Sequence, residues 1–451
     1  MKRFLKLAAT VCTAAMLAGI VPGCGQNSAQ GSSSQAQGST VQSQAASGKE
    51  TSEPVTLRFS WWGGDARHKA TLAAIAEYEK LHPNVKINGE YSGYSGYEQK
   101  LVTQLSGGTA PDIITVDSYW IYDLAAQGDM FANIYDQKNI DISSFNKNVL
   151  DYYVLNGKLT GLPVGLNSFC LEYNKNLFKT MGIPEDTVWT WDNLLSIGST
   201  VNKKDSSKYF LCQDSNEARL LLKAYIEQKT GKELINSDGT LGFDRAAMLD
   251  ALTYYKKLID NKVIQSPKES APFENNPTQN PKWINGDFAT IIEYTAAFTV
   301  NQTNLKWPLG ITKMPAAADA KAKTDSVPSM FIALNKDSKQ LDEASKFVNW
   351  FFNDKGAAAI LKDVRGVPPT QMARDILLSS NGLNTGVNNV VNKALENPSV
   401  RETAYTNNSE ITKIMLDEIE KIGYNGASPE TVTDEIMNSF NQKVKEIKNS
   451  K

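Results

Sequence analysis

The feature that most constrains the fold is an alternation of strand and helix patterns over residues 55–117. Residues 55–61 alternate apolar and polar side chains with a period of two, as a strand does. A helical pattern follows, then a second strand, a second helix over residues 97–106, and a nearly continuous apolar run over residues 112–117. The order strand–helix–strand–helix–strand predicts an α/β fold with mainly parallel sheets flanked by helices.

The first helix is expected to begin at Asp65, whose side chain is placed to cap it, and to end before His82 and Pro83. Within it, Leu72, Ile75 and Ala76 share one face, which we expect to be buried. Ligands of open parallel sheets bind beyond the carboxyl ends of the strands. The turn after Trp62 and the segment after Asp117 therefore fall on one edge, where aromatic and acidic side chains come together.

The rest of the chain continues the same alternation. About 400 residues of ordinary globular composition exceed what one hydrophobic core usually supports, so two domains are expected. Strands are predicted at 168–173, 288–293 and 330–334, and helices at 220–228, 246–258, 341–352 and from Ser409 onwards.

The N-terminus carries a secretion signal. Three basic residues precede a short apolar run over residues 7–21, too short to span a bilayer comfortably. Cys24 follows a small residue, in a context similar to the cleavage site of bacterial lipoproteins, which implies a signal peptide over 1–23 and lipidation of Cys24. Residues 24–53 are rich in Ser, Gln, Gly and Ala and predict a flexible linker. The mature protein would then be anchored to the cell membrane, outside the cytoplasm; a plain secretion signal is the alternative.

Composition excludes several classes of function. The net charge is −2 for the full sequence and no basic stripe is present, so nucleic acid is a poor partner. Two histidines in 451 residues leave almost nothing from which to build a His-based metal site or a Ser-His-Asp triad. Cys170 and Cys212 are expected to be free and buried. No metal, cofactor or catalytic residue is predicted.

Several short motifs, in their order along the chain, resemble the extracellular solute-binding proteins (family 1) of bacterial ABC sugar importers, the group that includes maltose-binding protein. The resemblance covers nearly all of residues 54–451. The motifs that carry it are Trp61-Trp62-Gly63, Gly107-Gly108-Thr109-Ala110-Pro111-Asp112, Gly161-Leu162-Pro163, Glu172-Tyr173-Asn174-Lys175, Trp283-Ile284-Asn285-Gly286-Asp287-Phe288-Ala289 and Gly366-Val367-Pro368.

This resemblance implies a two-lobe fold in which several crossing strands join the lobes and a carbohydrate ligand lies in the cleft between them. It further implies a binding protein rather than an enzyme, a monomer that delivers its sugar to the permease subunits of an ABC importer in the membrane. The crossings are expected at 162–167, 327–332 and 365–369, with lobe 1 formed by 54–163 and 330–364, and lobe 2 by 164–329 and 365–451.

A sugar offers an apolar C–H face and a rim of hydroxyls, so its site needs flat aromatic rings beside fixed donors and acceptors. Packing is an open alternative for Tyr97 and Trp283, and helix capping for Asp65. The predicted ligand-binding residues are Trp62, Asp65, Arg67, Tyr94, Tyr97, Asp117, Trp120, Asn167, Trp283, Glu293, Tyr294 and Arg365.

Arg67 suggests a sharper hypothesis, because a guanidinium beside a sugar site can pair with the carboxylate of a uronic acid. Acidic oligosaccharides such as pectin fragments are candidate ligands, and neutral sugars are the alternative. Two other functions stay open at this point. A glycoside hydrolase or lyase would need two converging carboxylates, for which Asp117 and Glu293 are the candidates. A surface adhesin or peptide-binding lipoprotein would have no sugar affinity.

Overall fold

The computed structural model describes residues 53–321, 327–396, 403, 405–406 and 408–449. The predicted signal peptide, the lipidation at Cys24 and all but the last residue of the predicted linker lie outside the described residues. Within the described part of the chain, no helix is both long and apolar enough to cross a membrane.

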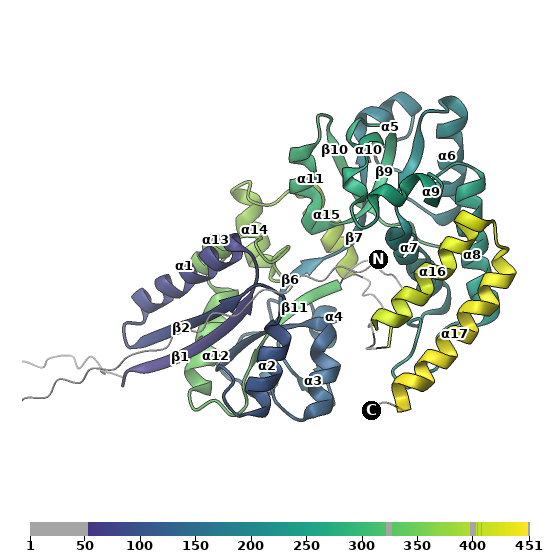
Figure 1. Cartoon of the computed structure of the whole chain (residues 1–451). Helices are drawn as coiled ribbons and strands as arrows, with labels where there is room; N and C mark the ends of the chain where they lie inside the picture. Colours follow the sequence, from purple (N-terminus) through teal and green to yellow (C-terminus); the bar gives the residue numbers. More distant parts are fainter. Residues whose placement is uncertain (1–52, 322–326, 397–402, 404, 407, 450–451) are drawn as a thin grey trace, which may run out of the picture. The chain divides into compact units, whose positions relative to one another are not determined.

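The first lobe is built on a five-stranded sheet with the strand order β2-β1-β3-β11-β6 (Figure 1). β1, β2 and β3 are parallel, which confirms the strand–helix–strand–helix–strand prediction, and all five residues of β3 are buried. β11 is antiparallel to both β3 and β6. The strands are β1 (Val55–Trp62), β2 (Val85–Ser92), β3 (Ile113–Asp117), β6 (Leu162–Asn167) and β11 (Val327–Leu334).

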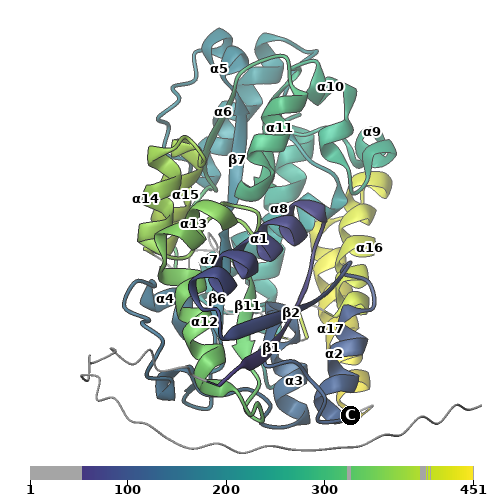
Figure 2. The ribbon, with the colours of Figure 1, turned by 90° about the vertical axis from the view of Figure 1, so that its left-hand side faces the viewer.

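Helices cover this sheet (Figure 2). They bury a shared core in which Phe59, Phe331 and Phe347 are fully enclosed. A short hairpin of β4 (Val154–Leu155) and β5 (Lys158–Leu159) lies beside the same core. The helices are α1 (Asp65–Leu81), α2 (Tyr97–Ser106), α3 (Ile121–Gln127), α4 (Lys147–Asp151), α12 (Leu341–Asn353) and α13 (Lys355–Leu361). α14 (Gln371–Ser379) packs on α12 and α13, but its buried Leu377 belongs to a different core.

Two expectations about α1 are wrong. Its buried face is formed by Thr71, Ala74, Ile75 and Tyr78, whereas Leu72 is 39% exposed and Ala76 is also exposed. The N-cap is Gly64, so Asp65 occupies the first turn and its side chain makes no capping bond. Thr71 is polar but buried, and Leu72 is apolar but exposed. The positions of the apolar residues therefore did not indicate which face of the helix is buried.

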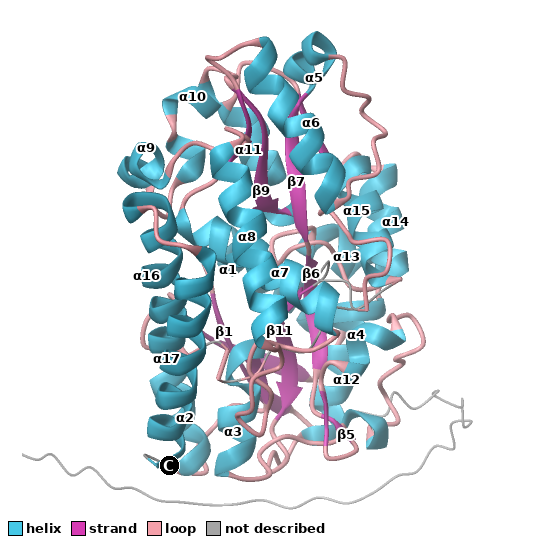
Figure 3. Cartoon of the chain, turned by 90° about the vertical axis from the view of Figure 1, so that its right-hand side faces the viewer, coloured by secondary structure: helices cyan, strands magenta, loops and turns pink. Residues whose placement is uncertain are grey.

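The second lobe is built on a four-stranded sheet with the order β10-β7-β9-β8, whose strands β7 and β9 lie among helices (Figure 3). The sheet has a core on each face. Alternate residues of β9 enter the two cores, as the pleat requires: Ile292 faces one and Ile291 the other. The strands are β7 (Phe169–Asn174), β8 (Tyr209–Cys212), β9 (Phe288–Tyr294) and β10 (Leu309–Lys313).

Long helices cover one face of this sheet. α16 and α17 form an antiparallel pair that packs on α7 and α8 and is joined by the ion pair between Lys421 and Glu435 (Figure 1). The helices of this lobe are α5 (Lys175–Met181), α6 (Trp191–Lys204), α7 (Ser215–Thr230), α8 (Arg245–Asp260), α9 (Pro267–Ser270), α10 (Pro281–Ile284), α11 (Phe298–Asn304), α15 (Thr385–Leu395), α16 (Ser409–Asn425) and α17 (Pro429–Asn449).

Both sheets are mixed, and the expectation of mainly parallel sheets is therefore wrong. In the second sheet only the β8–β9 pairing is parallel, whereas β7 pairs antiparallel with both β9 and β10. The reason is the connectivity. β6 leads directly into β7 of the other sheet, and β11 returns to the first sheet, so these strands run against their neighbours.

The connections between the lobes are fastened by main-chain contacts. Leu166 and Val367 exchange two backbone hydrogen bonds of 2.7 and 3.0 Å, which join the end of β6 to the segment after Arg365. Gly165 lies so close to that segment that an added Cβ would be 1.8 Å from the carbonyl oxygen of Arg365. The position therefore requires glycine. The predicted lobe boundaries stay a prediction. They fall within β6 and within β11, so each of these strands would belong partly to each lobe.

Candidate functional site

Four aromatic rings meet at the carboxyl edge of the first sheet. Trp62 ends β1, Trp120 follows β3, and Tyr94 and Tyr97 lie at the entry to α2. The ring of Trp62 lies 5.2 Å from that of Trp120 and 5.1 Å from that of Tyr97, and Tyr94 stacks on Trp120 at 5.5 Å. We call Trp62, Tyr94, Tyr97 and Trp120 the aromatic cluster. Two of its segments, the ends of β1 and β3, were predicted to lie together at this edge, and the segment before α2 joins them in the structure.

The four rings of the aromatic cluster differ in their exposure to solvent. Tyr94 is 53% exposed, whereas Trp62, Tyr97 and Trp120 are each less than a tenth exposed. The hydroxyl of Tyr97 lies 2.9 Å from the Ser60 hydroxyl and donates to the carbonyl of Thr115 at 3.0 Å, so Tyr97 has the packing role that the sequence left open. Tyr94 is the ring of the cluster that solvent reaches most.

Asp117 adds an acceptor beside these rings. It ends β3, is 8% exposed, and accepts a 3.3 Å hydrogen bond from the hydroxyl of Tyr94. Burial, with the charge of Asp117 as the next cause, raises the pKa of Tyr94 to about 12. A flat ring and a carboxylate held together in this way match the C–H face and the hydroxyl rim of a sugar.

Arg67 approaches the same edge from the first turn of α1. Its guanidinium donates to the carbonyls of Trp62 at 3.1 Å and Val364 at 3.4 Å, and burial lowers its pKa. Gly63 makes room for it, because a Cβ there would lie 2.6 Å from Cδ of Arg67. Asp65, two residues earlier, is exposed. Two main-chain carbonyl groups thus hold the guanidinium of Arg67 in place. Because carbonyl groups are uncharged, they do not neutralise its positive charge.

The facing edge of the second sheet carries Glu293 and Tyr294 at the carboxyl end of β9. Tyr294 pairs in register with Phe169, and their rings lie 4.3 Å apart. Burial raises the pKa of the half-buried Glu293. Phe169 was not among the predicted site residues, although its place as the first residue of β7, directly after a crossing, was a usable signal.

Three predicted residues have structural roles. The Oδ1 atom of Asn167 accepts hydrogen bonds of 3.0 Å from the Thr295 hydroxyl and the Ala296 amide, which fastens the first crossing to the second sheet. Trp283 is 1% exposed, and its ring packs edge-on against the ring of Trp307 at a centroid distance of 4.9 Å. Trp283 therefore has the packing role that was left open as an alternative to ligand binding. Arg365 is 6% exposed and donates to the hydroxyl of Thr71, so it is enclosed by the fold.

Three buried ionisable groups lie on strands of the second sheet: Cys170 and Glu172 on β7, and Cys212 on β8. Glu172 is fully buried, and burial raises its pKa to about 8, with the charge of Glu293 raising it further and a 2.9 Å bond from Asn301 opposing the rise. Cys170 and Cys212 are both free and buried, as predicted, and burial raises the pKa of both thiols. Among the described residues, no group of three or more His, Cys, Asp and Glu could hold a metal ion.

Comparison with known proteins identifies the family. Residues 65–358 match the model of the bacterial extracellular solute-binding proteins, well over half of the chain. The chain belongs to this family. Membership confirms the resemblance found in the sequence, makes the chain an extracellular binding protein, and removes the glycoside hydrolase alternative, because proteins of this family bind solutes and are not catalysts.

Known relatives of this solute-binding protein agree. A putative binding protein of Brucella abortus is 28% identical over 61% of the chain; that match spans 66% of the relative's own length. A solved periplasmic oligogalacturonide-binding protein from Yersinia enterocolitica is 27% identical, with a TM-score of 0.76 over 87% of this chain and 99% of that one. Its structure has also been solved with saturated digalacturonic acid.

A third similar structure is named as a de novo designed cysteine esterase. It is 27% identical, with a TM-score of 0.81 over 88% of this chain and 100% of that one. Among the described residues of the present chain, neither Cys170 nor Cys212 can act as such a nucleophile. Both thiols are buried, and their raised pKa values keep them protonated, whereas nucleophilic cysteines react as thiolates.

Proposed function

We propose that this solute-binding protein captures an oligosaccharide between its two lobes and delivers it to the permease of an ABC importer. The observation that carries the proposal is the aromatic cluster with Asp117 beside it, at the edge where α/β sheets bind ligands. In this proposal a sugar ring stacks on Tyr94, the exposed ring of the aromatic cluster, and Asp117 accepts from the hydroxyls of the sugar.

We further propose that the preferred sugar is acidic. Arg67 supports this, because its hydrogen bonds go to carbonyl groups and leave its charge for a ligand carboxylate. The digalacturonic acid bound by the similar Yersinia protein is of this chemical class. Neutral oligosaccharides are the alternative ligand, and they would use the aromatic cluster and Asp117 without the arginine.

Capture works by closure in this account. The ligand first binds the aromatic cluster of lobe 1, and Phe169, Glu293 and Tyr294 of lobe 2 then complete its surroundings. The closed form is favoured by the extra affinity that these second-lobe contacts provide. The permease reads the closed form, and lipidated Cys24 keeps the monomeric receptor at the membrane.

The test is calorimetric titration of the purified protein with a panel of neutral and acidic oligosaccharides, with product analysis of the same samples. Saturable binding of at least one oligosaccharide without breakdown supports the proposal, and a preference for uronic acids supports the role of Arg67. The variant Arg67→Ala should then lose the preference while still binding neutral sugars. If none of the oligosaccharides in the panel binds, the proposal is contradicted and the peptide-binding or adhesin alternative is favoured.

A further inference from the structure

The side chain of Arg67 is held by a residue 297 positions later in the chain. Its Nε atom donates to the carbonyl of Val364 at 3.4 Å, and its Nη1 atom donates to the carbonyl of Trp62 at 3.1 Å. The third nitrogen, Nη2, has no acceptor among the described residues. Main-chain groups therefore direct the guanidinium of Arg67, and one nitrogen is left for a ligand.

The backbone of Arg67 is tied to the same distant segment. The hydroxyl of Thr71, one turn further along α1, donates to the carbonyl oxygen of Arg67 at 2.6 Å, and it accepts a hydrogen bond from Nη2 of Arg365. Thr71 is fully buried and Arg365 is 6% exposed. Arg67 thus bonds to Val364, and the next residue, Arg365, bonds back to α1 through Thr71, so that both the side chain and the backbone of Arg67 are held.

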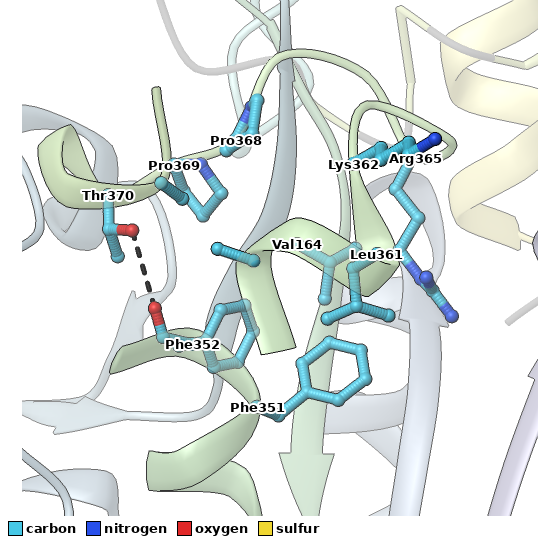
Figure 4. A pocket seen from close by; sticks show the side chains of 11 residues that line it. Val164, Phe351, Phe352, Leu361, Lys362, Arg365, Pro368, Pro369 and Thr370 are labelled. Atoms are coloured by element: carbon cyan, nitrogen blue, oxygen red, sulfur yellow. Dashed lines mark hydrogen bonds between the residues drawn. The ribbon is translucent and has the colours of Figure 1, made fainter. Parts of the chain in front are cut away.

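Packing fixes the guanidinium of Arg365 in this position. The ring of Phe351 lies 5.3 Å from the guanidinium carbon. Figure 4 shows the side chain of Arg365 running past Leu361, so that the guanidinium lies away from Pro368 and Pro369, which line a small cavity. The guanidinium of Arg365 is therefore directed towards α1 and not into this cavity.

Stability alone does not account for an arginine at position 365. The Nε and Nη1 atoms of Arg365 are buried and have no hydrogen-bond partner among the described residues. Burial, and then the positive charge of Arg67, lower the pKa of Arg365 to about 9, and no carboxylate acts on the pKa of either arginine. A buried cation that is only partly satisfied and is repelled by its neighbour costs stability, so an apolar side chain of similar length would stabilise the fold at least as well.

We propose that Arg365 and Thr71 are positioning residues for acidic sugars, because through the hydroxyl of Thr71 they hold Arg67 in the orientation in which its free Nη2 atom meets a ligand carboxylate. The inference rests on the proposed role of Arg67 in binding acidic sugars. It goes further by assigning the preference for such sugars to a buried pair behind the arginine. An arginine side chain has many rotamers, and fixing it before the ligand arrives removes part of the entropic cost of binding.

The test compares digalacturonic acid with the neutral galactose disaccharide by calorimetric titration of the purified protein. The readout is the preference, which is the ratio of the Kd for the neutral disaccharide to the Kd for the acidic one. Thr71→Val removes the hydroxyl and keeps both positive charges, whereas Arg365→Met replaces the guanidinium with an apolar group. Each should lower the preference about 5- to 30-fold by weakening the acidic ligand alone, and Thr71→Ser, which keeps a hydroxyl, should retain it.

Arg374→Met is the matched control. Arg374 is likewise buried, at 4% exposed, and its Nε atom is also without a partner, but its guanidinium donates to the carbonyls of Pro368 and Pro369. This variant should keep the wild-type preference even though its Tm falls, because it leaves carbonyl groups unsatisfied. Arg365→Met should show the opposite result, with a lower preference and a Tm no lower than that of the wild type.

A wild-type preference in Thr71→Val would overturn the positioning role, and so would a loss seen in Arg365→Met alone, since the charge of Arg365 would then act directly. If Thr71→Val does not fold, a crystal structure of the wild-type protein with digalacturonic acid replaces it. Arg67 should contact the ligand carboxylate while still bonded to the carbonyls of Trp62 and Val364, and an Arg67 that has left both carbonyls would contradict the inference. A wild-type protein without any preference for the acidic disaccharide would instead refute the acidic-sugar proposal itself, before any variant is made.

Discussion

Gly165→Ala tests the contact that joins the lobes. The added Cβ would lie 1.8 Å from the carbonyl oxygen of Arg365, whereas real Cβ atoms essentially never approach another heavy atom within 3.0 Å. Backbone must therefore move by more than 1 Å, since the obstacle is a main-chain atom that cannot rotate away. The two hydrogen bonds between Leu166 and Val367, one residue further on, cannot survive this shift intact.

The expected loss has two parts. Two weakened hydrogen bonds are worth about 1–3 kcal/mol together, and overpacking of a close contact adds about 1–3 kcal/mol. The free energy of unfolding should therefore fall by about 2–6 kcal/mol. In urea unfolding followed by tryptophan fluorescence, the midpoint should drop by about 1 M or more.

Gly93→Ala is the matched control for this substitution. Gly93 is exposed, has an ordinary backbone conformation, and has nothing within 4 Å of the position of an added Cβ. Its unfolding midpoint should stay at the wild-type value, with a change in stability within about 0.5 kcal/mol. Equal midpoints for Gly165→Ala and Gly93→Ala would refute the close contact and, with it, the fastening of the first crossing to the third.

Three further predictions concern ligand binding, pH and thiol chemistry. Tyr94→Ala should weaken oligosaccharide binding about 10- to 100-fold in calorimetry, through loss of the stacking surface, while Tyr135→Ala, which removes an equally exposed ring elsewhere, leaves it unchanged; equal effects would exclude a specific role for the cluster. Glu172 has a pKa of about 8 when folded against an ordinary 4.5, so the folded state holds a proton that the unfolded state releases, and wild-type stability should fall by up to about 4 kcal/mol between pH 5 and 8. Glu172→Gln should flatten that decline in urea melts, and an unchanged slope would contradict the raised pKa. Cys170 and Cys212 should not react with a thiol reagent at pH 8 until urea unfolds the protein, and fast labelling of native protein would contradict their burial.

Local patterns in the sequence predicted much of the fold. The run at residues 112–117 was apolar enough to identify a strand buried on both faces, which the structure places at Ile113–Asp117, and α2 begins and ends at the predicted residues. The antiparallel strands could not be found in this way, because strand direction depends on where the chain crosses between lobes. That information lies in pairings such as Leu166 with Val367, which are 201 positions apart.

The candidate site was predictable where strand ends determine it. Trp62 and Asp117 end two parallel strands, Trp120 follows the second of them, and parallel strands end at one edge. Arg365 was assigned to the ligand, whereas it is enclosed against Thr71, because burial of a long polar side chain depends on packing between distant segments. Phe169 was missed for the same reason: its neighbour, Tyr294, comes from another strand.

The most direct test of the central claim is a crystal structure of the protein with the tightest-binding oligosaccharide from the calorimetric panel. We expect a sugar ring stacked on Tyr94, with a hydroxyl within hydrogen-bonding distance of Asp117 and residues of β9 on its other side. A ligand bound away from the carboxyl edge of the first sheet, with the aromatic cluster left uncovered, would contradict it.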